Sequence, residues 1–259
     1  MLPMSTVRAA AAAAGNTPVV EHGARLGYAA GGLLHLLLAW VTVQMAWTSY
    51  GGEADQSGAL GTLAGSAVGS ILLWATAAGF ALLAVWQVIE AIARRDLGTW
   101  LKSAGKAAVY VALAWTAASV VQGSGGSSDT SGMTASLMAK PYGRALLAAV
   151  GLTVLGIAVY HVVKGWRASF LADLREHPGT WTVTTGRIGY VAKGVALALV
   201  GAFLVGAGAT GESERAKDLD GALRSVLEAP LGKVLLTLVA IGFAAYGLYS
   251  FARARYARV

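Results

Sequence analysis

Cysteine is absent from this chain of 259 residues, and charged residues make up only 13% of it. The absence of cysteine excludes disulfides, thiolate metal sites and cysteine catalysis. The charged fraction is about half of the roughly 25% that is usual in soluble domains. The sequence also contains no phosphate-binding loop, zinc motif or nucleophile elbow. We therefore expect a protein that is not an enzyme and that binds no cofactor or metal.

Apolar residues, in contrast, are abundant. They make up 56% of the chain, the mean hydropathy is +0.60, and 34 residues are glycine. A water-soluble fold could not bury so much apolar surface, whereas a bilayer solvates it, and glycine suits close helix contacts in membranes. Six apolar segments have the roughly 20 residues that a transmembrane helix needs, and none alternates as a strand would. The sequence thus predicts an all-α, polytopic membrane protein with helices at 26–47, 70–93, 103–122, 144–163, 188–209 and 233–252.

The six segments form three tandem copies of a two-helix unit. The loop inside each unit carries the pattern D-x-[S/D]-G, followed by a short segment of mixed polarity and a glycine that opens the second helix. The patterns begin at Asp55, Asp129 and Asp218, and the glycines are Gly69, Gly143 and Gly232, so the copies are spaced by 74 and 163 residues. Such coincidences at fixed spacing indicate an internal repeat. We divide the chain into a cytoplasmic tail (1–22) and repeats at 23–95, 99–168 and 185–256.

The distribution of basic residues predicts the orientation. With a cytoplasmic tail, 14 of the 20 Lys and Arg residues lie on the cytoplasmic side, and the first outer loop has none. Cytoplasmic loops of membrane proteins carry such an excess. We expect a multi-pass protein of the bacterial plasma membrane with both termini in the cytoplasm. The repeats are then parallel, so a six-helix bundle with pseudo-threefold symmetry about the membrane normal is expected.

Several of these motifs resemble a known family. R-x-G-Y opens the first helix at Arg25–Tyr28 and again at Arg187–Tyr190, and P-x-G opens the second helix at 141–143 and 230–232. Together with the acidic loop pattern, they resemble the actinobacterial membrane family catalogued as domain of unknown function 1206. The resemblance implies three tandem two-helix domains and a membrane location, but no accepted activity and no catalytic residues. This chain departs from the pattern at Ala67, which replaces the proline, and at 101–106, where R-x-G-Y is lost.

The acidic turns are the first candidate site. Threefold symmetry would gather Asp55, Asp129 and Asp218, with Asp220 nearby, around one axis on the outer face. A ring of carboxylates could attract or bind a cation. Alternatively, acidic and hydroxyl side chains in these turns cap the short helix that follows, by accepting bonds from backbone N–H groups. Suitable caps are Ser57, Ser131 and Asp220.

Two histidines inside apolar segments, His35 and His161, form the second candidate site. An ionisable residue within a membrane is a functional candidate by default, here for handling a proton or a polar substrate. Haem ligation is disfavoured because the two residues lie at different depths, whereas bis-histidine ligation needs them level. A hydrogen bond to a neighbouring helix is the structural alternative.

Basic residues near the cytoplasmic helix ends are the third candidate. Lys106 and Lys193 either snorkel to the interface or contact anionic lipid headgroups. Arg253 and Arg255 are expected to form a membrane-proximal anchor on the same headgroups. Glu90 occupies the repeat position of Lys164 and Arg253 and is expected to pair with Arg94.

Two functions remain open from the sequence. The first is an accessory or scaffold protein that binds lipid or another membrane protein, because the loops are small and no soluble domain is present. The second is a transporter or channel for an ion or small solute along the pseudo-threefold axis. The net charge of +7 fits a membrane surface, so we expect the bilayer as a partner and no nucleic acid.

Overall fold

The computed structural model describes residues 18–64, 67–93, 97–123, 130–175 and 179–258. It contains six helices that are long and apolar enough to cross a membrane, which confirms the predicted fold class. These helices are α2 (Pro18–Trp47), α4 (Ala67–Ala93), α5 (Leu97–Val121), α7 (Gly143–Trp166), α8 (Thr180–Thr210) and α10 (Gly232–Tyr256). The described residues form no β-strand, and a single isolated bridge joins Leu174 to Ala257.

The helices extend beyond the predicted apolar segments. The predicted tail at 1–22 lies outside the described residues up to position 17, and α2 already begins at Pro18. Likewise, α8 begins at Thr180, although its apolar segment begins at 188. Polar first turns stay helical where their side chains reach water or pair with one another, as Arg25 and Glu21 do at 2.8 Å.

Three short helices follow the acidic turns. They are α3 (Gln56–Gly61), α6 (Thr130–Met138) and α9 (Leu219–Glu228). The P-x-G motif then turns the chain into the next long helix, through a left-handed residue, Tyr142 or Leu231. No side chain fits at the glycine that follows. A Cβ on Gly143 would lie 1.8 Å from the carbonyl oxygen of Leu137, and Gly232 is similarly confined.

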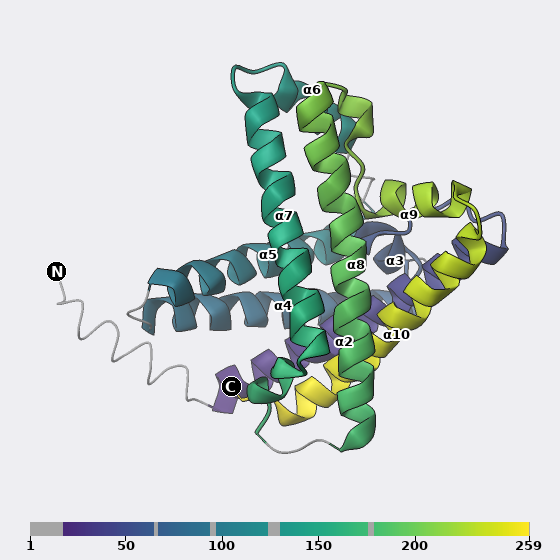
Figure 1. Cartoon of the computed structure of the whole chain (residues 1–259). Coiled ribbons are helices and arrows are strands. Elements are labelled where there is room, and N and C mark those ends of the chain that lie inside the picture. Colours follow the sequence, from purple (N-terminus) through teal and green to yellow (C-terminus); the bar gives the residue numbers. More distant parts are fainter. Residues whose placement is uncertain (1–17, 65–66, 94–96, 124–129, 176–178, 259) are drawn as a thin grey trace.

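Each long helix packs against a helix of a neighbouring repeat (Figure 1). Helix α4 pairs with α5, α7 with α8, and α10 with α2. In each pair, the second helix of one repeat meets the first helix of the next, and the last pair returns from the third repeat to the first. The pairs diverge from one another in Figure 1. This cyclic order is the pairing that pseudo-threefold symmetry requires.

The second repeat departs from the symmetry. Helix α2 packs against α4 and α8 against α10, whereas α5 and α7 do not pack together over the described residues. A glycine lies at each of the two contacts within a repeat, α2 with α4 and α8 with α10. A Cβ on Gly27 would lie 2.5 Å from the carbonyl oxygen of Gly79, and one on Gly189 would lie 2.5 Å from the backbone nitrogen of Tyr246. The first helices align at spacings of 75 and 162 residues, as Gly31, Lys106 and Lys193 do, so Lys102 occupies this position. The second repeat therefore lacks the small residue that lets two helices approach.

We call the end of the molecule where α2 begins and α10 ends the terminal side, and the opposite end, with α3 and α9, the loop side. On the loop side an apolar core fills the space between α2, α4 and α10. Its fully buried side chains include Val41, Leu73 and Leu236, and the short helices add Leu60 and Leu223. The loop-side half of the molecule is therefore closed by packed apolar side chains.

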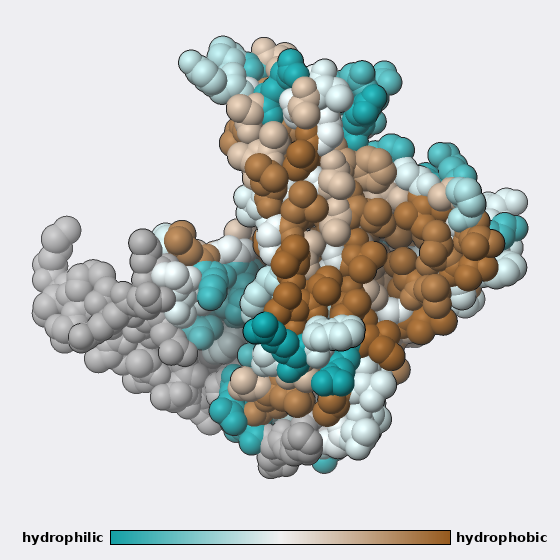
Figure 2. Space-filling view, viewed as in Figure 1, coloured by the Kyte–Doolittle hydropathy of each residue, from teal (hydrophilic) through white to brown (hydrophobic). Residues whose placement is uncertain are grey.

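The outward surface is apolar as well. Figure 2 shows apolar residues over α7, α8 and α10, with hydrophilic residues at both ends of this surface. Large apolar side chains such as Leu152 and Leu238 are 61% and 59% exposed. An apolar surface of this extent suits contact with lipid.

Candidate functional site

Two of the acidic turns act as helix caps. Asp55 precedes α3 and accepts a hydrogen bond from the backbone N–H of Gly58 at 2.8 Å. Asp218 precedes α9 and accepts one from Gly221 at 2.9 Å. The capping alternative therefore holds for these turns, because each carboxylate satisfies a backbone donor that the helix itself leaves free.

The expected caps Ser57 and Asp220 are wrong, since the first aspartate of each turn takes that role. Asp220 instead links the first and third repeats. Its two carboxylate oxygens accept hydrogen bonds from the backbone of Ala54 and from the guanidinium of Arg224, both at 2.8 Å. The third predicted turn, with Asp129 and the side chain of Ser131, lies outside the described residues.

The electrostatics of this contact between the first and third repeats on the loop side are those of a structural contact. The salt bridge to Asp220 raises the pKa of Arg224. Burial raises the pKa of Asp55, and the nearby carboxylates of Asp218 and Asp220 add to this effect. In the part of the chain that the structure describes, no three His, Asp or Glu side chains are placed to hold a metal ion. The acidic turns on the loop side thus join two repeats.

The two histidines hydrogen-bond within their own helices. The Nδ1 atoms of His35 and His161 lie 2.7 and 2.8 Å from the carbonyl oxygen four residues earlier. The structural alternative, a hydrogen bond to a neighbouring helix, is not seen among the described residues, and each ring instead contacts an aromatic ring of another helix. The ring centre of His35 lies 4.5 Å from that of Tyr246, and the ring centre of His161 lies 5.7 Å from that of Tyr190.

These rings belong to a larger group on the terminal side, which we call the terminal cluster. All three repeats contribute to it. Its members are Tyr28, His35, Glu90, Lys106, His161, Lys164, Asp173, Tyr190, Lys193, Tyr246, Tyr249 and Arg253. The ring of Tyr190 lies at its centre, 5.2 Å from the ring of Tyr246 and 5.4 Å from that of Tyr249.

Arg253 lies inside this cluster, so a headgroup that it contacts has to enter the cluster, and that contact stays a prediction. Its side chain is only 17% exposed, and its guanidinium carbon lies 4.2 Å from the ring centre of Tyr28. One guanidinium nitrogen is 3.9 Å from a carboxylate oxygen of Asp173. The aromatic face and the carboxylate stabilise the cation away from water. Arg255 remains exposed, and its headgroup contact stays a prediction.

The two candidate lysines behave differently. The ammonium of Lys193 lies 4.5 Å from the ring centre of Tyr246 on α10, so this side chain points into the cluster. Lys106 is exposed on α5 and lies within electrostatic range of Arg253 on the third repeat and Lys164 on the second, without a hydrogen bond, ion pair or ring contact among the described residues. Lys106 is thus a cluster cation that stays accessible from outside.

The acids of the cluster come from a helix end and a loop. Asp173 ends the 3-10 turn η1 (Ser169–Asp173) and binds Lys164 at 2.7 Å. The loop is held in place because Arg258 donates its backbone N–H to the carbonyl of Asp173 at 2.9 Å. Glu90 interacts electrostatically with Lys106, while its expected partner, Arg94, lies outside the described residues.

The terminal cluster can hold an anion. It gathers four cations, Lys106, Lys164, Lys193 and Arg253, with two acids and a set of aromatic rings. The hydroxyl of Tyr249 is buried without a hydrogen-bond partner among the described residues. Helices α5 and α7 have no extensive contact with each other over the described residues, and both carry members of the cluster at the terminal side.

The terminal cluster was not predicted from the sequence, although a signal for it was present. Glu90, Lys164 and Arg253 share one repeat position, and Tyr28 shares another with Tyr190. Cyclic packing brings equivalent positions together at the centre, so charged residues at one repeat position mark a shared site. Asp173 carried no signal, because it lies outside the aligned helices.

The comparisons with known proteins agree with the architecture. The family model described as Domain of Unknown Function (DUF1206) matches residues 26–94, 101–168 and 188–257, one match in each repeat. An uncharacterized protein of Bacillus subtilis, YxxB, is 32% identical over 254 residues that cover 92% of each chain, so relatives of this chain are not confined to actinobacteria. No solved structure matches. With its three matched repeats and six apolar helices, the chain belongs to the DUF1206 family.

Proposed function

We propose that this protein is an accessory or scaffold protein of the bacterial plasma membrane that binds anionic lipid in the terminal cluster. The observation that supports this proposal most strongly is that four cations and only two acids, contributed by all three repeats, lie together at the terminal side. Basic pockets between transmembrane helices on the cytoplasmic side suit anionic headgroups. With the predicted orientation, both termini in the cytoplasm, the cluster lies at that leaflet, and we expect a lipid to reach it from the side between α5 and α7, which have no extensive contact with each other.

Several features favour binding over catalysis. The described cluster offers cations and aromatic rings, with its histidine Nδ1 atoms bonded to backbone carbonyls. A lipid held between α5 and α7 would also give another membrane protein a surface made partly of these two helices, which are the least buried of the six. A protein partner is therefore the second component of the proposed role.

Transport of an ion or small solute is the alternative function. Polar side chains from three repeats do meet near the pseudo-threefold axis, as transport requires. On the loop side, however, Val41, Leu73 and Leu236 are fully buried in a packed apolar core. The polar region is thus closed at one end, which is the geometry of a binding site, and this observation ranks transport second.

Lipid titration tests the proposal. Purified protein in detergent is titrated with fluorescent phosphatidylglycerol or phosphatidylcholine, and the affinities are compared. Lys106→Gln should weaken phosphatidylglycerol binding roughly fivefold, because a basic residue near an anionic headgroup contributes about 1 kcal/mol. Lys140→Gln, at an exposed site on the loop side, is the matched control. Equal affinity of the wild type for both lipids contradicts the proposal.

Liposome flux separates the two functions. Protein reconstituted into liposomes should pass no more anions or cations than protein-free liposomes do. Flux above that level that is lost in His35→Ala would favour the transport alternative, because His35 is the deepest titratable member of the cluster on α2.

A further inference from the structure

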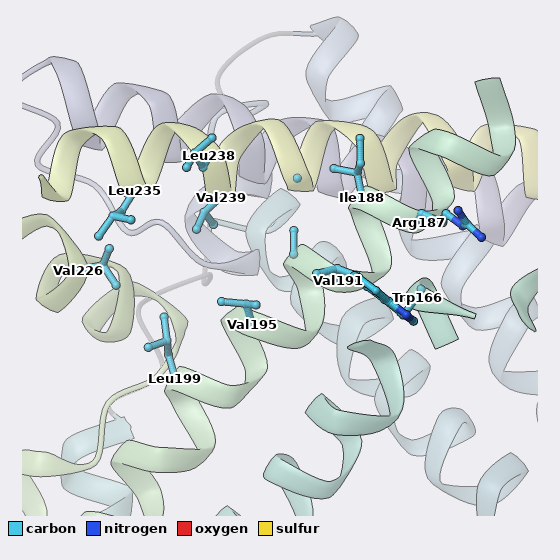
Figure 3. Close-up of a pocket in the computed structure, with 13 residues that line it drawn as sticks. Trp166, Arg187, Ile188, Val191, Val195, Leu199, Val226, Leu235, Leu238 and Val239 are labelled. Atoms are coloured by element: carbon cyan, nitrogen blue, oxygen red, sulfur yellow. The ribbon is translucent and has the colours of Figure 1, made fainter. Parts of the chain in front are cut away.

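A groove of about 870 Å³ runs along the outer surface between α8 and α10 (Figure 3). Its walls come from Val191, Val195 and Leu199 on one helix and from Leu235 and Leu238 on the other. These positions face away from the terminal cluster, which α8 contacts through different residues. The groove is therefore a separate feature that opens directly to the surrounding lipid.

The depth of the groove follows from a close helix contact. A Cβ on Gly242 would lie only 2.1 Å from the Cβ of Ala192, so α8 and α10 approach closely at this point. Both residues line the groove and form its floor. The larger residues on either side rise as walls, and Val226 of α9 lines its loop-side end.

The length of the groove matches one lipid leaflet. From Arg187 to Leu199, α8 rises by roughly 18 Å at ~1.5 Å per residue. Half of the hydrocarbon core of a bilayer is roughly 15 Å thick. An acyl chain anchored at the terminal-side interface could therefore lie along the groove for its whole depth in that leaflet.

The terminal-side end of the groove carries a positive charge. Figure 3 shows Arg187 and Trp166 together at one end, while Val226 and Leu235 lie at the other. Arg187 is exposed, and none of the described residues forms a hydrogen bond or ion pair with its guanidinium. Trp166 is 79% exposed, and its indole N–H suits the polar edge of a bilayer. An unpaired cation above an apolar groove is complementary to an anionic headgroup above an acyl chain.

We propose that the groove between α8 and α10 binds one acyl chain of an anionic phospholipid of the terminal-side leaflet, with the phosphate at Arg187. This inference rests on the proposed lipid-binding function and assigns a second site to it. Arg187 holds the headgroup, Trp166 borders it, and the walls of α8 and α10 hold the chain. A second anionic lipid in the terminal cluster is compatible with this one because the two sites use opposite faces of α8.

Native mass spectrometry of the full chain, with phosphatidylglycerol or phosphatidylcholine added, tests this site. Val195→Trp and Leu238→Trp each fill the groove and should remove one bound lipid of either kind. Leu152→Trp, on the exposed surface of α7 outside the groove, is the control and should bind like the wild type. Arg187→Gln should weaken phosphatidylglycerol binding roughly fivefold and phosphatidylcholine binding less, because the choline cation offsets the charge of the same phosphate.

The outcomes separate this inference from the proposed function. Groove-filling variants that keep the lipid number and affinity of the wild type overturn the groove site, and so does an Arg187→Gln variant with unchanged affinity for phosphatidylglycerol. If Lys106→Gln is nevertheless weakened, the terminal cluster and the proposed function stand. If the wild type shows no preference for phosphatidylglycerol, both proposals fail.

Discussion

Replacing Gly189 by alanine adds one methyl group where α8 crosses α10. The added Cβ would lie 2.5 Å from both the backbone nitrogen and the Cα of Tyr246. Backbone atoms cannot rotate away as a side chain can, so the helices must separate by about 1 Å at this point to reach ordinary contact. The change also moves Tyr190 and Tyr246, two rings of the terminal cluster.

The expected cost follows from two opposing effects. Overpacking of a tight contact destabilises a protein by about 1–3 kcal/mol. Alanine in place of glycine favours the helix itself by roughly 0.5–1 kcal/mol. Gly206→Ala supplies the matched control on the same helix, because a Cβ there meets no atom within 4 Å. Both variants gain the same helix preference. The difference between their free energies of unfolding therefore isolates the cost of overpacking, about 1–3 kcal/mol.

Thermal unfolding in detergent, followed by circular dichroism, measures this difference. For a chain of this size, a change of 1 kcal/mol shifts the melting temperature by about 2–4 °C. We expect Gly189→Ala to melt several degrees below Gly206→Ala. Equal melting temperatures would refute the claim that glycine sets the distance between α8 and α10.

Four further predictions concern the acidic turns and the orientation. Asp55→Ala should cost about 1 kcal/mol through the lost cap, whereas Asp55→Asn keeps an acceptor and should not. Because the pKa of Asp55 is raised in the folded state, ionisation of Asp55 lowers the stability of the fold as pH rises through the carboxyl range. Asp55→Asn should remove this loss of stability, and melting curves between about pH 3 and pH 7 would reveal the difference. Asp220→Asn should weaken the link to Arg224 and lower stability by about 1 kcal/mol, since the pair is partly exposed; an unchanged denaturation midpoint would contradict this. A reporter fused after Val259 should be cytoplasmic, and periplasmic activity would reverse the orientation.

Hydropathy and self-comparison predicted most of the architecture. Six long apolar segments must be helices in a bilayer, because every backbone polar group has to be satisfied within its own segment. The repeated P-x-G motif also has a local cause, since the chain at Gly143 and Gly232 leaves no room for a side chain. Local constraints of this kind are legible in a single sequence.

Features that depend on the pairing of helices could not be predicted in the same way. The open second repeat follows from Lys102 at the place of a glycine, but the sequence did not reveal that this position carries the contact within a repeat. The burial of Arg253 similarly depends on Tyr28 and Asp173, which lie far from it in the chain. Hydropathy treats a basic residue at a helix end as interfacial, whereas packing here turns it inward.

The most direct test of the account is purification of the protein from its native membrane in mild detergent. Mass spectrometry would identify every lipid and protein retained, and an absorbance spectrum of the same fraction would reveal any bound chromophore. The account predicts a colourless fraction that retains anionic phospholipid in stoichiometric amount, with less in Lys106→Gln than in Lys140→Gln. A fraction that retains only zwitterionic lipid, or equal amounts of anionic lipid in both variants, would contradict the claim that the three repeats assemble an anionic lipid site.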